Sequence, residues 1–173
     1  MLTITNNIGF LEPFFKDSYK RINIREYARI RRISPPFASK ILSSFKNENI
    51  LIKETEKNYI YYTANKESKE FIELSRLYWY FVFKKIGILE YLEREMINPV
   101  VILFGSFSKA EIKQNSDIDI AIFTISKKVV NLEKFEKKLN RKIQLFVLKS
   151  REDLKNNSLL NNILNGFILS GEW

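Results

Sequence analysis

"LFGSFSKAEIKQNSDIDIAIF", residues 103–123, stands apart from the rest of this chain. It holds two apolar runs, and the first of them ends in Gly105 and Ser106. Eleven residues after Ser106, Asp117 and Asp119 enter the second run with one isoleucine between them. Residues two apart in a strand share a face. We therefore expect both carboxylates to project together, with the isoleucines of this run packed on the opposite face.

Two carboxylates that are held close together in a half-buried place repel one another. A cation between them removes this repulsion, and ligand sets made only of oxygen suit Mg²⁺ or Mn²⁺. Magnesium in proteins usually comes with substrate phosphates rather than with a full cage of side chains. The sequence therefore predicts Asp117 and Asp119 as metal ligands and as catalytic residues.

The segment "FGSFSKAE", residues 104–111, is the predicted phosphate partner of this metal pair. Gly105 allows the backbone to approach a ligand closely at the end of a strand. Ser106 stands where a helix can begin, so its hydroxyl and the free amides nearby would face an anion. Lys109 follows one turn later. An anion cradle opposite a carboxylate–metal pair predicts a phosphoryl or nucleotidyl transfer site.

This arrangement resembles the nucleotidyltransferase superfamily that includes DNA polymerase β-like enzymes. The closest form is the minimal nucleotidyltransferase, with the pattern Gly-Ser-x-Ala-Arg-Gly-Glu, four variable residues, then Ser-Asp-x-Asp-Leu. The chain keeps this spacing from Gly105 to Ile120, and the resemblance covers about residues 85–150. It differs in that Ser108, Lys109 and Ala110 replace Ala-Arg-Gly. Lysine keeps the charge of arginine but loses its planar fork.

The resemblance implies a third carboxylate on the following strand, in a pattern such as Arg-x-Val-Asp-Leu-Val. The matching segment runs from Arg141 to Phe146, and Gln144 stands at the position of the aspartate. In the family this carboxylate helps to activate the attacking hydroxyl and holds one of two metals. Glutamine ligates weakly through its carbonyl, carries no charge and cannot act as a base. Nucleotide binding is therefore expected to survive this change more easily than catalysis does.

The N-terminal part predicts the order helix, helix, turn, helix, hairpin. Residues 10–20 and 22–33 suit helices, "SPP" at 34–36 breaks the chain, and a further helix follows over 36–49. The runs "ILIKE" and "YIYYT" then suit a hairpin joined by the link at 55–58. Over roughly residues 8–64 this order resembles a winged helix-turn-helix, which implies DNA as a partner.

Residues that would contact DNA fall into three groups under this resemblance. The helix after the turn would enter the major groove, and arginines on the preceding helix and the turn would meet phosphates. The recognition-helix group is Ser34, Phe37, Ser39, Lys40, Ser43 and Ser44, the phosphate group is Arg25, Arg29, Arg31 and Arg32, and the wing tip is Lys57 and Asn58. Alternatively, each arginine simply lies on a solvent-exposed helix face and contacts no DNA.

The charge of the chain favours a polyanion partner for the N-terminal part. The net charge is +9 over 173 residues. Residues 1–66 hold 12 basic against 6 acidic side chains, a surplus of 6, whereas residues 67–173 hold 17 against 14, a surplus of 3. A generally lysine-rich proteome is the alternative. Because cysteine and histidine are absent, disulfides, thiolate metal sites, histidine triads and imidazole acid–base chemistry are excluded.

The expected fold class is α+β, with a winged helix-turn-helix, a linking helix and a small mixed-sheet nucleotidyltransferase domain. The expected boundaries are 1–65, 66–86 and 87–173. The linking helix is apolar on more than one face, so Phe71, Leu74, Tyr78, Phe81 and Val82 are expected to pack between domains or in a homodimer seam. Gly87 is expected to end it, and Gly166 to cap the last helix at its C-terminus.

Three functions follow as alternatives. The first is a Mg²⁺- or Mn²⁺-dependent nucleotidyltransferase that transfers AMP from ATP to a protein acceptor; the resemblance implies a partner toxin of the HEPN class. That class needs a histidine, so this chain would be the antitoxin-like side. The second is a DNA-binding transcriptional regulator whose nucleotidyltransferase fold binds nucleotide or a partner without turnover. In the third, the carboxylates are a relic and the domain only dimerises the winged helix.

A cytoplasmic protein with no membrane partner is expected. The start "MLTITNNIGFLEPFF" lacks the basic and apolar parts of a signal peptide. The most apolar segment, "LYWYFVF" at 77–83, is far shorter than the ~20 residues that span a bilayer.

Overall fold

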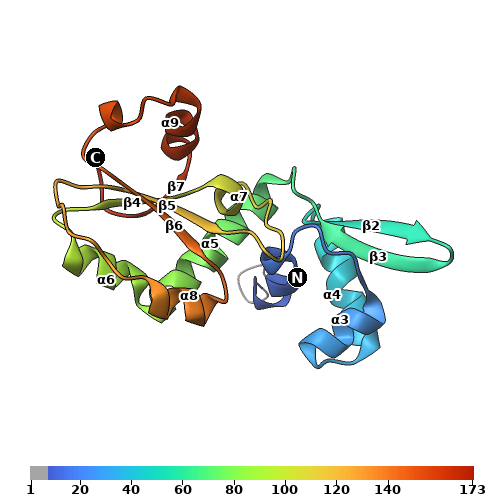
Figure 1. Cartoon of the computed structure of the whole chain (residues 1–173). Helices are drawn as coiled ribbons and strands as arrows, with labels where there is room; N and C mark the ends of the chain where they lie inside the picture. Colours follow the sequence, from blue (N-terminus) through green and yellow to red (C-terminus); the bar gives the residue numbers. More distant parts are fainter. Residues whose placement is uncertain (1–7) are drawn as a thin grey trace. The chain divides into compact units, whose positions relative to one another are not determined.

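The computed structural model describes residues 8–173, and the chain divides into two compact units (Figure 1). The first contains the chain up to Tyr78 together with residues 110–114, and the second contains Trp79–Lys109 and residues 115–173. The division falls inside helix α5 (Lys69–Ile86). The boundaries 1–65, 66–86 and 87–173 stay a prediction, and residues 1–7 of the predicted first domain lie outside the described part of the chain.

The first unit packs short helices against a three-stranded antiparallel sheet of order β1-β3-β2. Its core includes Phe14, Tyr27, Leu42 and Tyr62, which are all buried. The order of helices and hairpin is the predicted one, but strand β1 was not predicted and takes the first two residues of the helix expected over 22–33. The elements are η1 (Ile8–Leu11), α2 (Glu12–Lys16), β1 (Ile22–Asn23), α3 (Ile24–Arg31), α4 (Pro35–Asn47), β2 (Leu51–Glu56) and β3 (Tyr59–Ala64).

Local capping residues fix where these helices begin and end, as the sequence indicates. Asn23 Oδ1 accepts a hydrogen bond from the Glu26 amide at 2.9 Å and caps α3. Ser34 caps α4 in the same way, and Asn49 adopts the left-handed conformation after it. The hairpin turn is shorter than the expected link, because residues 55 and 56 still pair across the sheet with residues 60 and 59.

The segment 110–114 is tied into the first unit by Ser18, whose exposed fraction is only 1%. The Ser18 amide donates to the Ile112 carbonyl at 2.7 Å. The Ser18 hydroxyl accepts from the Ile112 amide at 2.9 Å. Ile112 is itself fully buried. No sequence pattern indicates that this polar-flanked stretch joins the N-terminal core.

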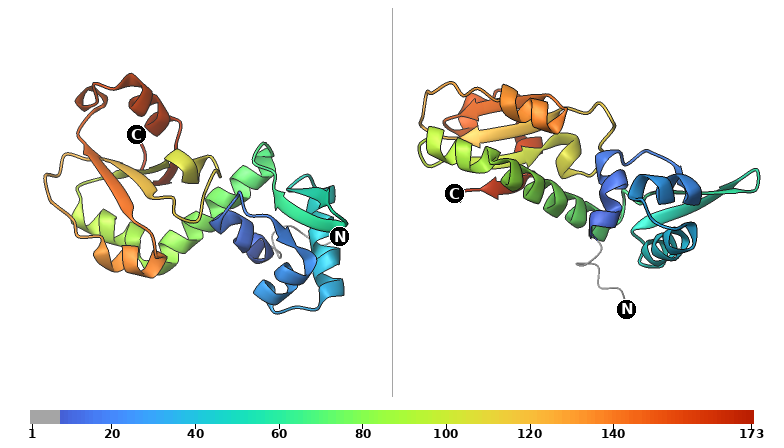
Figure 2. Two further views of the ribbon diagram at one scale, coloured as in Figure 1. Left: turned by 45° about the vertical axis from the view of Figure 1, so that its right-hand side comes forward. Right: turned by 90° about the horizontal axis from the view of Figure 1, so that it is seen from below.

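The second unit is built on a four-stranded sheet of order β6-β5-β4-β7. Strand β4 runs antiparallel to β5 and β7, whereas β5 and β6 are parallel, so the sheet is mixed as expected. Helices α6 and α8 cover one face of the sheet and α9 lies on the other (Figures 1 and 2). The elements are α6 (Ile88–Glu95), β4 (Val100–Phe104), α7 (Gly105–Ser108), β5 (Ile118–Phe123), α8 (Glu133–Leu139), β6 (Ile143–Leu148), η2 (Arg151–Asp153), α9 (Asn157–Leu164) and β7 (Phe167–Ser170).

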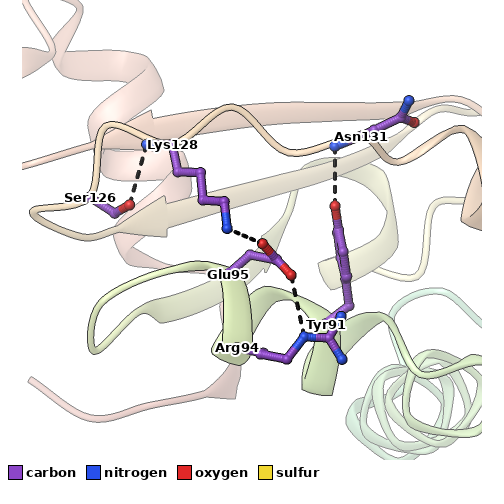
Figure 3. Close-up of polar contacts among 6 residues, drawn as sticks. All are labelled: Tyr91, Arg94, Glu95, Ser126, Lys128 and Asn131. Atoms are coloured by element: carbon purple, nitrogen blue, oxygen red, sulfur yellow. Dashed lines mark hydrogen bonds and ion pairs between the residues drawn. The ribbon is translucent and has the colours of Figure 1, made fainter.

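Side-chain contacts fix the loop between β5 and α8 to helix α6 (Figure 3). Glu95 forms ion pairs with Lys128 and, at 3.3 Å, with Arg94. The Asn131 amide donates to the hydroxyl of Tyr91 at 3.3 Å. These contacts hold the loop that follows β5, the strand whose other end carries the aspartates.

Two expectations for the helices need correction, and one strand was not predicted. Phe81 is 59% exposed, because the buried face of α5 is formed by Phe71, Ser75, Trp79 and Phe83, at intervals of four residues. Gly166 is not a left-handed cap, because its φ is not positive and the C-cap residue of α9 is Asn165. A Cβ at Gly166 would instead lie 2.6 Å from the Leu103 carbonyl oxygen, so the glycine serves close packing against β4. Strand β7, which follows it, has no counterpart among the predicted elements.

No helix within residues 8–173 combines the length and the apolar character that a membrane crossing requires.

Candidate nucleotide and metal site

Three neighbouring strands bring the predicted site residues to one end of the sheet. Phe104 of β4 pairs with Asp119 of β5, which in turn pairs with Gln144 of β6. Asp117 precedes β5 by one residue and shares its face with Asp119. The intervening isoleucines of β5 are completely buried. The alternation expected from the sequence therefore holds, and both carboxylates leave the sheet on one face.

Gly105 lies directly against the Asp119 carboxylate. It has a φ of +67°, and a Cβ at this position would stand 2.2 Å from Asp119 Oδ2. Only glycine combines this backbone conformation with such a close approach. The predicted site has two sides, the Gly-Ser turn and the aspartate pair. They come into contact at Gly105.

The remaining cradle residues follow on helix α7. Ser106 is its second residue and is half-buried, and its hydroxyl has no hydrogen-bond partner among residues 8–173. Lys109 comes directly after the helix, is exposed and pairs with no described residue. The Ser108 hydroxyl donates to the Gly105 carbonyl at 3.0 Å and closes the turn. Both Ser106 and Lys109 are thus available to an anion.

The carboxylates sit in an environment that disfavours two adjacent negative charges. Burial, and then the neighbouring charge of Asp117, raise the pKa of Asp119 above its ordinary value of 3.8. Asp117 Oδ2 accepts a hydrogen bond from Gln144 Nε2 at 2.9 Å. The described residues 8–173 contain no cluster of three or more histidine, cysteine or acidic side chains able to hold a metal.

This donor set fits one hard cation together with a phosphate ligand. Asp117 and Asp119 supply two anionic oxygens, and phosphates and water complete the shell that Mg²⁺ prefers. Gln144 adds no charge to the site and presents its amide NH₂ to Asp117. The residues therefore suit one divalent ion with a nucleotide better than they suit a pair of metals.

Arg141 is a site-shaping residue to which the sequence alone assigns no role. Its Nη1 donates to the Ser116 carbonyl at 2.7 Å, next to Asp117. Its guanidinium also lies 5.3 Å from the ring centroid of Phe107, which belongs to α7. Arg141 thus contacts both the segment beside Asp117 and helix α7 of the Gly-Ser turn. The only sequence signal is the arginine that begins the third motif of the resembled family.

The predicted DNA contacts do not all remain available. Arg31 Nη1 forms an ion pair with Glu12 at 2.8 Å, and its guanidinium lies over the ring of Phe10. Ser43 lies half-buried with its hydroxyl 3.4 Å from that of Tyr62. Arg31 therefore holds the first unit together instead of presenting a free charge.

The other predicted DNA contacts lie on several elements of the first unit. Arg25 and Arg29 are exposed on α3, Arg32 ends that helix, and Lys57 lies in the hairpin turn. On α4, Lys40 is exposed and Ser39 is half-buried. A groove brings Arg25 and Arg29 together with residues 58–60 of the hairpin. Tyr59, which the sequence does not single out, contributes to that groove.

One comparison with known proteins gives a family match. Residues 87–169 match the family model described as polymerase beta, nucleotidyltransferase. This match supports the nucleotidyltransferase superfamily for this part of the chain, which contains Gly105, Asp117, Asp119 and Gln144. Neither the search of curated proteins nor the search of solved structures found a match.

Proposed function

We propose that residues 87–169 bind a nucleoside triphosphate, most simply ATP, together with one Mg²⁺ or Mn²⁺ ion. Asp117 and Asp119 would hold the ion, while Gly105, Ser106 and Lys109 would receive the phosphates. The observation that carries this proposal is the contact between the Gly105 backbone and the Asp119 carboxylate, which joins the two halves of the motif.

We further propose that binding, without fast turnover, is the main function of this domain. Nucleotidyl transfer needs a base near the attacking hydroxyl and stabilisation of charge on the phosphate. Gln144 supplies neither, and its amide group is engaged with Asp117. The chain would then act as a transcriptional regulator that senses nucleotide or a protein partner, in the cytoplasm where ATP and DNA are both available.

Transfer of AMP to a protein acceptor, such as a HEPN-type toxin, is the second candidate function. It is favoured by the family match over residues 87–169 and by the complete Gly-Ser and Asp-x-Asp spacing. In this reaction an acceptor hydroxyl oxygen attacks the α-phosphorus of ATP, the bond to the β-phosphate oxygen breaks, and pyrophosphate leaves.

Incubation with ATP labelled at the α-phosphate distinguishes the two candidates. The wild type, with Mg²⁺ or Mn²⁺, is expected to bind ATP and to label itself or an added acceptor only slowly. Gln144→Asp restores a third carboxylate and is expected to raise the rate of labelling. Asp117→Asn/Asp119→Asn is the control that abolishes it. A wild type that labels as fast as Gln144→Asp would establish the second candidate and reject the first.

For the first unit we propose a winged helix-turn-helix that binds DNA. The order of helices, the sheet β1-β3-β2 and the two-residue hairpin turn support this proposal. The exposed basic side chains on α3 and α4 add the charge that a polyanion needs.

A further inference from the structure

A groove of about 850 Å³ runs between helix α3 and the outer part of the β2–β3 hairpin, within the first unit. It is lined by residues 23–26, Arg29 and residues 58–60. Strand β1 pairs with β3 only at Tyr61 and Tyr62. The groove therefore follows the part of β3 that β1 leaves uncovered.

The charge of the groove is positive and uncompensated. Arg25 and Arg29 are four residues apart, so they lie on the same side of α3. Both are exposed, and neither forms an ion pair or hydrogen bond with any residue of 8–173. The acidic group of the groove, Glu26, is already paired with Lys20 at 3.1 Å. Two guanidinium groups thus remain without an anion.

Two acidic side chains on the nearby hairpin share one arginine as their ion-pair partner. Arg21 forms ion pairs with Glu54 at 3.1 Å and with Glu56 at 2.8 Å. On the hairpin side, the groove is lined by Asn58 and Tyr59, and Tyr59 is 64% exposed. Arginine, asparagine and tyrosine side chains are typical donors to phosphate and sugar groups of nucleic acids.

The exposed face of α4, the expected recognition helix, has fewer free polar groups for DNA. The Ser34 hydroxyl is used as the cap of the helix. The Ser43 hydroxyl lies against Tyr62, and the Ser44 hydroxyl donates to Glu48 at 3.2 Å. Among the predicted polar contacts on this helix, only Ser39 and Lys40 remain.

We infer that the groove between α3 and the hairpin binds the sugar-phosphate backbone of duplex DNA, and that it anchors the DNA more strongly than α4 does. The inference rests on the DNA-binding function proposed above. Backbone contacts carry no direct sequence information. Binding is therefore largely independent of base sequence.

The experiment titrates the full chain against labelled DNA duplexes of unrelated sequence over a series of salt concentrations. Each phosphate contact contributes about 0.9 to the slope of log affinity against log salt. Arg25→Gln/Arg29→Gln is expected to flatten this slope by about 1.8, which corresponds to a roughly 60-fold loss of affinity at about 0.1 M salt. The loss should be similar for every duplex.

Two variants complete the test. Lys40→Gln/Lys46→Gln removes the same number of exposed charges from α4 and is expected to weaken binding less. Arg25→Lys/Arg29→Lys keeps both charges and is expected to preserve the slope. Circular dichroism and thermal melting verify that each variant folds.

The outcomes separate the groove from the wider proposal. A larger loss in Lys40→Gln/Lys46→Gln, or an unchanged slope in Arg25→Gln/Arg29→Gln, would overturn the groove inference and leave DNA binding in place. Wild-type protein that shows no salt-dependent binding to any duplex would overturn both.

Discussion

At the scale of single residues, Gly105 combines two constraints that any side chain would violate. Its φ of +67° is unfavourable for other residues, and a Cβ would meet the Asp119 carboxylate. Gly87 has a similar φ of +79° but open space around it, so it isolates the cost of the backbone conformation.

We therefore expect Gly105→Ala to abolish binding of Mg²⁺–ATP and Gly87→Ala to preserve it. Both changes should lower the free energy of unfolding by about 1 kcal/mol for the left-handed conformation alone. Isothermal titration with Mg²⁺–ATP and urea denaturation measure the two effects. Equal ATP affinities in the two variants would show that the contact between Gly105 and Asp119 does not shape the site.

Asp119 predicts a pH dependence of stability. Its pKa in the folded protein is raised above 3.8, so the unfolded chain loses this proton first as the pH rises. The contribution of Asp119 to stability is therefore full below 3.8 and is lost as the pH rises through the raised pKa. We expect the wild type to lose stability relative to Asp119→Asn over this window in EDTA.

Added Mg²⁺ should reduce this loss, because a cation favours the charged carboxylate. Urea denaturation of both proteins at several pH values, with EDTA or with Mg²⁺, gives the comparison. The difference between the proteins isolates Asp119 from other carboxylates. Parallel stability curves in EDTA would contradict a strained aspartate pair.

At the scale of elements, the segment 110–114 is hydrogen-bonded to a buried serine of the first unit. Ser18→Ala removes the hydroxyl that bonds to Ile112 and leaves a buried backbone amide without that partner. The expected cost is about 1–3 kcal/mol of unfolding free energy. Ser39→Ala, a half-buried serine with no hydrogen bond to residues 8–173, should change it by less than about 0.5 kcal/mol. Similar costs for both serines in thermal or urea unfolding would argue against the anchor.

Elements with local signals could be predicted from the sequence, and elements fixed by distant contacts could not. Asn23 and Ser34 predict where their helices begin, because a capping side chain bonds to an amide within three residues. Strand β7 is short and depends on its pairing with β4, far away in sequence. The sequence around Gly166 predicts a helix cap, whereas the structure shows that the glycine allows close packing against β4, which is far away in sequence.

The same distinction applies to the candidate site. Asp117 and Asp119 are recognisable because their spacing of two encodes a shared face. The hydrogen bond from Gln144 to Asp117 and the contacts of Arg141 join separate elements, so no spacing reveals them. Arg31 was expected to be a free phosphate contact, and its ion pair with Glu12 depends on helix packing that the pattern does not contain.

At the scale of the whole molecule, we propose a different anionic ligand for each unit: DNA for the first and a nucleotide for the second. The first unit carries unpaired arginines on α3, and the second carries a carboxylate pair beside a Gly-Ser turn. Under the proposed functions, the charge surplus of the N-terminal part would serve DNA, whereas the nucleotide site would depend on a divalent ion. Mg²⁺ should be required for ATP binding and dispensable for DNA binding.

Binding of Mg²⁺–ATP by the second unit can be tested through the melting temperature of the full chain with ATP, with and without Mg²⁺. A ligand at about 100 times its Kd stabilises the state that it binds by about 2.7 kcal/mol, which for a protein of this size corresponds to a rise of roughly 5–10 °C. We predict this rise for the wild type only when Mg²⁺ is present, its loss in Asp117→Asn/Asp119→Asn, and its retention in Glu90→Gln/Glu172→Gln, which removes two exposed carboxylates elsewhere in the second unit. A wild type whose melting temperature does not respond to Mg²⁺–ATP, or an equal response in Asp117→Asn/Asp119→Asn, would contradict the account.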